Sequence, residues 1–353
     1  MKTSNRTNKL KALIQQPYMW GVFAIIALLI INLIKDPGYL SISIGSNGHL
    51  VGNIIDILRS SAPILMIALG MTLVIATAGI DLSVGSIMVV AGAVSMEFLN
   101  GAEAPNSIGT ALTALGLALA IGTVLGAVNG ILVAYVRLQP FITTLIMMLA
   151  GRGIAKVITG GQNTASVSAP FRWIANGYVF GVPIVFVFAI VMVIAVALVV
   201  RRSALGLMIE SIGINPEASR MAGIKPRGLL ITVYALSAFL AAIAGVFATA
   251  SVMTVDVSNT GYQLELDAIL AVVIGGTSLA GGRFSIGGSV VGALLIATLD
   301  KTVVFLGVSS SATPAFKAIV IIILVLMQSD RIRSSFARYR RRRALQTRKE
   351  ALA

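Results

Sequence analysis

Long apolar runs dominate the sequence and constrain its fold more than any other feature. Of the 353 residues, 57% are hydrophobic and 11% are charged, which is more apolar surface than a soluble core can bury. A helix needs roughly 20 apolar residues to cross a hydrocarbon core about 30 Å thick. The sequence therefore predicts an all-α membrane protein that crosses the bilayer many times.

About ten runs meet this requirement, and glycines break several of them. The predicted transmembrane helices are 18–34, 62–78, 82–99, 108–136, 141–158, 178–200, 229–252, 266–279, 286–306 and 318–328. The first run follows basic residues but lacks a small-residue cleavage site. We therefore expect a retained first helix rather than a signal peptide.

Lysine and arginine set the predicted orientation, because short loops rich in these residues stay on the cytoplasmic side. Eighteen of the 27 basic residues lie in segments 2–11, 201–227 and 331–349. Six predicted helices separate the first two segments and four separate the last two, so all three lie inside. We expect one polytopic domain with a cytoplasmic N-terminus 1–17, a first helix set 18–200, a cytoplasmic coupling loop 201–228, a second helix set 229–328 and a basic cytoplasmic tail 329–353.

The net charge of +14 follows from this bias. It favours contact with anionic lipid headgroups. The arginine run 340–343 follows a predicted membrane helix, so we expect membrane lipid rather than nucleic acid as its partner.

Several kinds of chemistry lack the residues they need. The chain has no cysteine and a single histidine, His49, which excludes disulfides, thiolate metal sites and histidine clusters. Segment 276–283 has the glycines of a phosphate loop, but Gly282 and Arg283 stand where that loop needs lysine and serine or threonine. A Ser-His-Asp set is also missing. We expect no catalytic site, no metal site and no cofactor on this chain.

Glycines recur at four-residue spacing in two predicted helices, as Gly122, Gly126 and Gly130 and as Gly288 and Gly292. A missing side chain lets two helix backbones approach closely in lipid. We predict that these glycines pack helices, with a channel-lining role as the alternative.

Segments 79–85 and 276–282 look like two copies of one unit, because each lies between two apolar runs. The predicted topology gives both hairpins the same orientation, which indicates an internal repeat. Repeated halves with helices broken at membrane depth are a common plan in transporters.

Asp81 is the most informative polar residue, because an ionised carboxylate between two apolar runs is costly unless it faces a polar interior. It either lines a polar path or caps a helix that starts at Leu82, and the two roles are compatible. The predicted substrate pathway contains Asp81, Ser83, Asn129, Gln139, Thr143, Glu265 and Asp267.

Each of these residues has an alternative role. The neutral side chains, with Thr144 beside them, equally suit a hydrogen bond to a neighbouring helix. Glu265 and Asp267 stand near a predicted outer helix end, where a solvated rim is the alternative. Arg152 and Lys156 lie one turn apart on an apolar segment, and we expect structural pairing or snorkelling there.

Several motifs, taken together, resemble the ribose-type carbohydrate permeases of ABC importers. They are GMTLVIATAGIDLSVG at 70–85, NG at 129–130, QPFITTL at 139–145, GRG at 151–153, GINPEASR at 213–220 and ELDAILAVVIGG at 265–276. They follow the family order over nearly the whole chain. The sequences of 138–141 and 264–267 are most similar to those of a galactofuranose-type permease.

Within 203–229, the pattern resembles the E-A-A-x-x-x-G signature of a short cytoplasmic helix that docks into a motor subunit, with serine in the third place. The resemblance implies that Ile214, Asn215, Glu217, Ala218, Ser219 and Gly223 couple this chain to an ATPase.

The resemblance implies a transport subunit rather than an enzyme, in the bacterial cytoplasmic (inner) membrane with both termini inside. ATP and Mg are then bound by a partner ATPase, and a sugar-binding protein delivers a monosaccharide such as galactofuranose or ribose. A second permease subunit is either a copy of this chain or a related one.

Two alternatives remain. One is an ABC permease for a nucleoside or a branched-chain amino acid. The other is a proton-coupled carrier that uses Asp81 or Glu265 as its proton site. The basic segment 203–229 argues against the carrier, which has no motor to dock.

Overall fold

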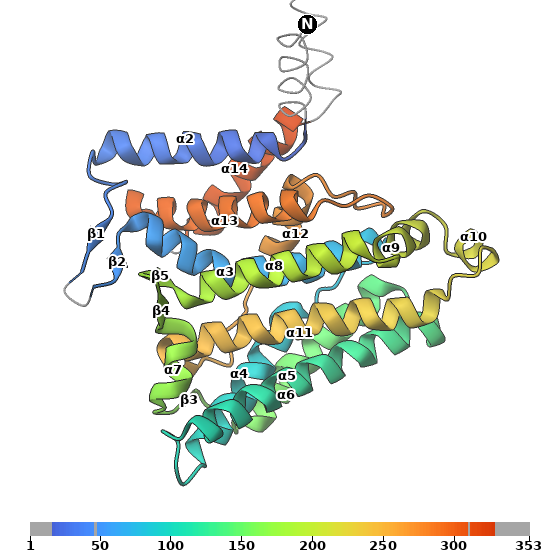
Figure 1. Cartoon of the computed structure of the whole chain (residues 1–353), viewed down its shortest axis with the longest axis horizontal. Coiled ribbons are helices and arrows are strands. Elements are labelled where there is room, and N and C mark those ends of the chain that lie inside the picture. The colour runs from blue at the N-terminus through green and yellow to red at the C-terminus, as the bar shows by residue number, and fades with distance from the viewer. Residues whose placement is uncertain (1–15, 46–47, 310, 329–353) are drawn as a thin grey trace, which may run out of the picture.

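The computed structural model describes residues 16–45, 48–309 and 311–328. Within these ranges the chain is a bundle of helices with three short antiparallel strand pairs (Figure 1). The helices are α2 Met19–Lys35, α3 Asn53–Ala76, α4 Val84–Asn100, α5 Ile108–Ile131 continued by the π-helix η1 Leu132–Val136, α6 Pro140–Ile158, α7 Ala169–Asn176, α8 Ile184–Arg202, α9 Leu205–Ile214, α10 Pro216–Met221, α11 Pro226–Val252, α12 Leu264–Ile274, α13 Ile286–Leu306 and α14 Thr313–Gln328.

The strand pairs are β1 Ser43–Ile44 with β2 Leu50–Val51, β3 Thr164–Ala165 with β6 Thr254–Val255, and β4 Tyr178–Val179 with β5 Val182–Pro183. The predicted basic segments 2–11 and 331–349 lie outside the described residues. Of the three basic segments, the structure therefore covers the middle one.

The prediction of an all-α protein that crosses the membrane several times is confirmed. In the described part of the chain, six helices are long and apolar enough to span a bilayer, namely α3, α5 with η1, α6, α8, α11 and α13. Helices α2, α4, α9 and α14 contain shorter apolar stretches, and α12 has 11 residues. The count of ten crossings is not established, because the shorter helices fall below the length of about 20 residues that a full crossing needs.

Several predicted boundaries need correction. The helix expected at 62–78 begins earlier, at Asn53. The prediction missed its first turns because Asp56 and Arg59 interrupt the apolar pattern there. The run expected at 178–200 begins at Ile184, since 178–183 forms the β4–β5 hairpin. Helices α7 and α9 were not predicted. Both are short, with 8 and 10 residues, well below the length of about 20 residues by which transmembrane helices were sought.

Helix α11 lies at the centre of the bundle, packed against α3, α4 and α5, while α3 also contacts α13. In α3, 78% of the most apolar 18-residue window is buried, compared with 22% in α8. Helices α3, α4 and α11 therefore form the core. Helix α8 leaves most of its apolar surface exposed, as a lipid-facing helix does.

The glycines of α5 form its contact face with α11. A Cβ atom added at Gly122 would lie 2.6 Å from the Cβ of Ala242, and one at Gly126 would lie 2.3 Å from the Cβ of Ala238. At Gly130 it would lie 2.6 Å from the Cα of Ile231. The prediction that these glycines pack helices is confirmed.

The two ends of the helix bundle carry different connecting elements (Figure 1). The strand pairs and α7 lie at one end, and α10 lies at the other. The predicted topology makes the first end the outer one and the α10 end the cytoplasmic one.

We predict that Gly126→Ala lowers the melting temperature of the purified protein, because the added methyl group overlaps α11 and overpacking costs about 1 to 3 kcal/mol. Gly116→Ala is the matched control on the same helix, since a Cβ there meets no atom within 4 Å. It should be neutral or stabilising, as alanine is a better helix former than glycine by about 1 kcal/mol. Equal melting temperatures for the two variants would contradict the packing assignment.

Candidate functional site

The segment between α3 and α4 is not helical, and we call it the first break. Asp81 accepts hydrogen bonds that hold this segment in place. Asp81 Oδ1 accepts hydrogen bonds from the backbone N–H of Ser83, at 3.0 Å, and from the Ser83 hydroxyl. Its other oxygen, Oδ2, accepts from the Ser237 hydroxyl on α11 at 3.1 Å. The carboxylate therefore joins the turn before α4 to the central helix of the bundle.

Two further helices reach the same break. Asn129 on α5 donates from Nδ2 to the Ser83 hydroxyl oxygen at 2.9 Å. Thr144 on α6 donates from Oγ1 to the backbone carbonyl of Ile80 at 3.0 Å. The structure thus brings together three predicted residues, Asp81, Ser83 and Asn129, and adds Thr144. We call this group, with Ser237, the Asp81 cluster.

Asp81 is fully buried, and the described residues place no lysine or arginine in an ion pair with it. Burying a carboxylate without a cation is costly, so the hydrogen bonds must offset that cost. Helix α4 begins at Val84 with Ser83 as its N-cap, so the predicted helix start at Leu82 is wrong, although Asp81 does accept from a free amide as a capping residue would. Asp81 satisfies the amide of Ser83 in the preceding turn. Its predicted place on a substrate pathway stays a prediction.

Two buried polar atoms beside the Asp81 cluster lack a hydrogen-bond partner among the described residues, Asn129 Oδ1 and Tyr234 Oη. A Cβ atom added at Gly79 would lie 2.5 Å from Tyr234 Oη, so only glycine fits there. Sequence reasoning missed Ser237 and Tyr234. Their one signal was the presence of isolated hydroxyl groups in an apolar run.

The remaining predicted pathway residues do not join this cluster. Gln139 is exposed between η1 and α6, and the hydroxyl of Thr143 donates to the Gln139 carbonyl in its own helix at 3.1 Å. Among the described residues, no group of three or more histidine, aspartate or glutamate side chains is arranged to hold a metal ion.

Glu265 and Asp267 are buried on the first turn of α12, so the alternative of a solvated rim is wrong. Lys317 on α14 pairs with Asp267 at 2.9 Å and with Asp300 on α13 at 2.7 Å. Lys317 thus links α12, α13 and α14, and Asp267 is one of its two partners. Glu265 packs closely on the α4 start, where a Cβ at Gly85 would lie 2.3 Å from Glu265 Oε2.

Arg152 lies near this region on α6. Its guanidinium donates to the Thr260 carbonyl at 3.2 Å and lies 5.9 Å from the centre of the Tyr262 ring. The expectation of a structural pairing for Arg152 is confirmed.

A second break, 275–285, separates α12 from α13 and meets the first one. The backbone N–H of Gly282 donates to the carbonyl of Ala76, the last residue of α3, at 2.9 Å. A Cβ added at Gly281 would lie 2.8 Å from the Cβ of Ala78. The two segments predicted to be copies of one unit therefore lie side by side. Their common origin stays a prediction.

The predicted coupling segment touches both breaks through Gly213, near the end of α9. A Cβ added there would lie 1.9 Å from the Ala76 carbonyl oxygen and 2.5 Å from Gly282 N. Any side chain at 213 would separate these three backbones. We call Ala76, Gly213 and Gly282 the backbone junction.

Helix α10 follows directly and projects from the bundle (Figure 1). Asn215 caps it, since its Oδ1 accepts from the N–H groups of Glu217 at 2.9 Å and Ala218 at 3.0 Å. Helix α10 then ends before Gly223, whose φ of +87° lies in the region that favours glycine. Ser219 is buried, whereas Ile214, Asn215, Glu217, Ala218 and Gly223 are exposed. The arrangement gives a short rigid helix with a free surface.

Comparison with known proteins now identifies the family. Residues 53–327 match the family described as branched-chain amino acid transport system / permease component. The chain is 55% identical to the fructose import permease protein FruF of Bifidobacterium longum, over 98% of this chain and 97% of that protein. No solved structure gives a significant match.

Two further relatives are the galactofuranose transporter permease protein YtfT of Escherichia coli, 41% identical over 88% of this chain and 90% of its own length, and the ribose import permease protein RbsC of Escherichia coli, 39% identical over 87% and 93%. The resemblance to a galactofuranose permease is therefore real, but the similarity to the fructose permease is greater.

These relatives are permease subunits and not enzymes, so ATP hydrolysis is carried by a partner chain. Import of this kind involves an ATPase and a binding protein in general terms. The chain belongs to the branched-chain amino acid transport system / permease component family and, within it, to the ribose-type sugar permeases of ABC importers.

Proposed function

We propose that this chain is the subunit that moves a monosaccharide across the bacterial cytoplasmic membrane by alternating access. In this proposal both termini are cytoplasmic and α10 docks into the ATPase, which binds ATP and Mg. A sugar-binding protein delivers the substrate to the opposite end. A second permease subunit, either a copy or a related chain, completes the pathway.

The backbone junction is the observation that carries this proposal. A helix that receives a motor's displacement must pass it to the part of the permease that opens and closes. Gly213 lies two residues before the cap of α10, and it touches Ala76 and Gly282 with no side chain between them. Close-packed backbones transmit displacement rather than absorb it. Both helix breaks should therefore shift when α10 shifts.

A ketohexose such as fructose is the first candidate substrate, because the Bifidobacterium longum relative with 55% identity is named a fructose permease. Galactofuranose and ribose follow from the relatives at 41% and 39%. The predicted pathway residues are few, and only Asp81, Ser83 and Asn129 lie together, so we expect the binding protein to select the sugar.

The direct test is uptake into vesicles that contain this chain, its ATPase and its binding protein. ATP-dependent accumulation of D-fructose, D-galactofuranose or D-ribose is the expected result, with leucine and a nucleoside as comparison substrates. Accumulation of leucine or the nucleoside alone would replace the sugar assignment. Sugar uptake that persists without ATP and collapses with the proton gradient would favour the proton-coupled carrier.

We predict that Gly213→Ala uncouples hydrolysis from uptake, because the new methyl group pushes the coupling segment away from Ala76. Uptake should fall at least tenfold, while the complex still assembles and hydrolyses ATP. Gly228→Ala is the control near the start of α11, since a Cβ there meets no atom within 4 Å. Normal uptake by both variants would show that the backbone junction carries no displacement.

A further prediction separates the structural role of Asp81 from its transport role. Asp81→Asn removes a buried charge that has no cation, so the melting temperature should stay level or rise. Uptake should nevertheless fall if the carboxylate acts in transport. Ser95→Ala is the control, because the buried Ser95 hydroxyl bonds only to Ala91 and Gly92 of its own helix. Normal uptake by both Asp81→Asn and Asp81→Ser would remove the transport role.

A further inference from the structure

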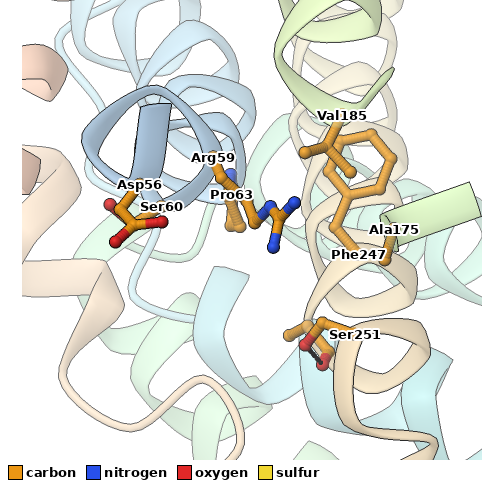
Figure 2. A pocket seen from close by; sticks show the side chains of 9 residues that line it. Asp56, Arg59, Ser60, Pro63, Ala175, Val185, Phe247 and Ser251 are labelled. Atoms are coloured by element: carbon orange, nitrogen blue, oxygen red, sulfur yellow. Dashed lines mark hydrogen bonds between the residues drawn. The ribbon is translucent and has the colours of Figure 1, made fainter. Parts of the chain in front are cut away.

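A cavity of about 340 Å³ lies at the end of the bundle opposite α10, between α3, α7, α8 and α11 (Figure 2). Small-molecule sites typically have volumes of about 300 to 1,000 Å³, with apolar walls and a few polar groups. Asp56, Arg59, Ser60 and Ser251 supply the polar groups, while Val185 and Phe247 supply apolar wall. None of these residues belongs to the Asp81 cluster or to the backbone junction.

Arg59 contacts the β4–β5 hairpin through Tyr178. Its guanidinium donates to the Tyr178 hydroxyl and lies 5.2 Å from the centre of the Tyr178 ring. The His49 ring stacks on that same tyrosine at 4.1 Å. Arg59 Nε is buried and has no hydrogen-bond partner among the described residues. The side chain is thus held against the β4–β5 hairpin, and Figure 2 shows it between Ser60 and Ser251.

Asp56 lies one turn before Arg59 on α3. Its Oδ2 accepts from Lys301 Nζ at 2.6 Å, and its side chain is 53% exposed. Asp56 is therefore paired with Lys301, whereas the Arg59 guanidinium contacts the neutral Tyr178 and comes from the next turn of the same helix. The cavity therefore offers a ligand hydrogen-bonding groups next to apolar side chains. This combination suits a neutral ligand with several hydroxyl groups better than an ion.

We propose that this cavity is an outer monosaccharide site, occupied after the sugar leaves the binding protein. The proposal rests on the proposed function. Arg59 donates to a sugar hydroxyl, Asp56 accepts from another, and the Phe247 and Val185 side chains contact the C–H face of the ring. Ser251 adds a hydroxyl on the far wall.

The absence of cysteine from the chain gives a direct test. Ser251→Cys places the only thiol of this subunit in the cavity, and a membrane-impermeant maleimide added outside vesicles of the intact complex should label it. D-fructose or D-ribose should slow the labelling, whereas leucine should not.

Two serine positions give matched controls. Ser258 is exposed in the loop after β6, so Ser258→Cys should be labelled at a rate that sugar does not change. Ser203 is exposed at the end of α8 next to the coupling segment, so Ser203→Cys should resist the external reagent.

Arg59→Gln, added to Ser251→Cys, should raise the sugar concentration needed for half protection roughly tenfold, because a charge-assisted hydrogen bond is lost. Unchanged labelling without sugar shows that the double variant is folded. Asp56→Asn serves the same purpose if Arg59→Gln disturbs the β4–β5 hairpin. If neither variant changes the sugar concentration needed for half protection, the proposal is overturned.

The remaining outcomes separate the two proposals. Labelling that no sugar slows, in a complex that still imports sugar, would overturn the outer site and leave the proposed function intact. Protection by leucine alone would overturn both. Failure of the reagent to reach Ser251→Cys from outside, with Ser258→Cys labelled, would also overturn the outer site.

Discussion

A helix that breaks inside an apolar bundle frees backbone groups that no water can satisfy, and this constraint shapes the whole molecule. Helix α3 ends at Ala76, and its carbonyl accepts from Gly282 in the other break. The Ser83 amide donates to Asp81, and the Ile80 carbonyl accepts from Thr144. Gly282 and Thr144 come from distant parts of the chain, whereas Asp81 belongs to the break itself. The break therefore holds α4, α6 and the segment before α13 in one arrangement.

The same constraint applies where the predicted coupling segment contacts the two helix breaks. Gly213 fits against Ala76 and Gly282 because it has no side chain, so three backbones meet at one point. A displacement of α10 has a short path through this point to both breaks. The cavity with Arg59 lies at the opposite end of the bundle, so the proposed sugar site and the proposed docking helix α10 are well separated.

The sequence predicted what depends on local pattern and missed what depends on distant partners. Apolar length and four-residue glycine spacing predicted the bundle and the α5 face at Gly126. They did not predict the start of α3, where Asp56 and Arg59 interrupt the pattern. The burial of Asp267 depends on Lys317, fifty positions later in the chain, so its own neighbours indicated a solvated rim. Ser237 joins Asp81 across 156 positions, with no local signal.

If α10 passes a displacement to the helix breaks, α10 and the breaks must move as one body. Spin labels on Ala218→Cys in α10 and Ala280→Cys in the second break, both exposed, would report their separation in the intact complex with and without ATP. A second pair, Ala218→Cys with Val157→Cys at the far end of α6, gives the reference. We predict that the first distance stays constant through the cycle while the reference distance changes. A first distance that changes as much as the reference would contradict it.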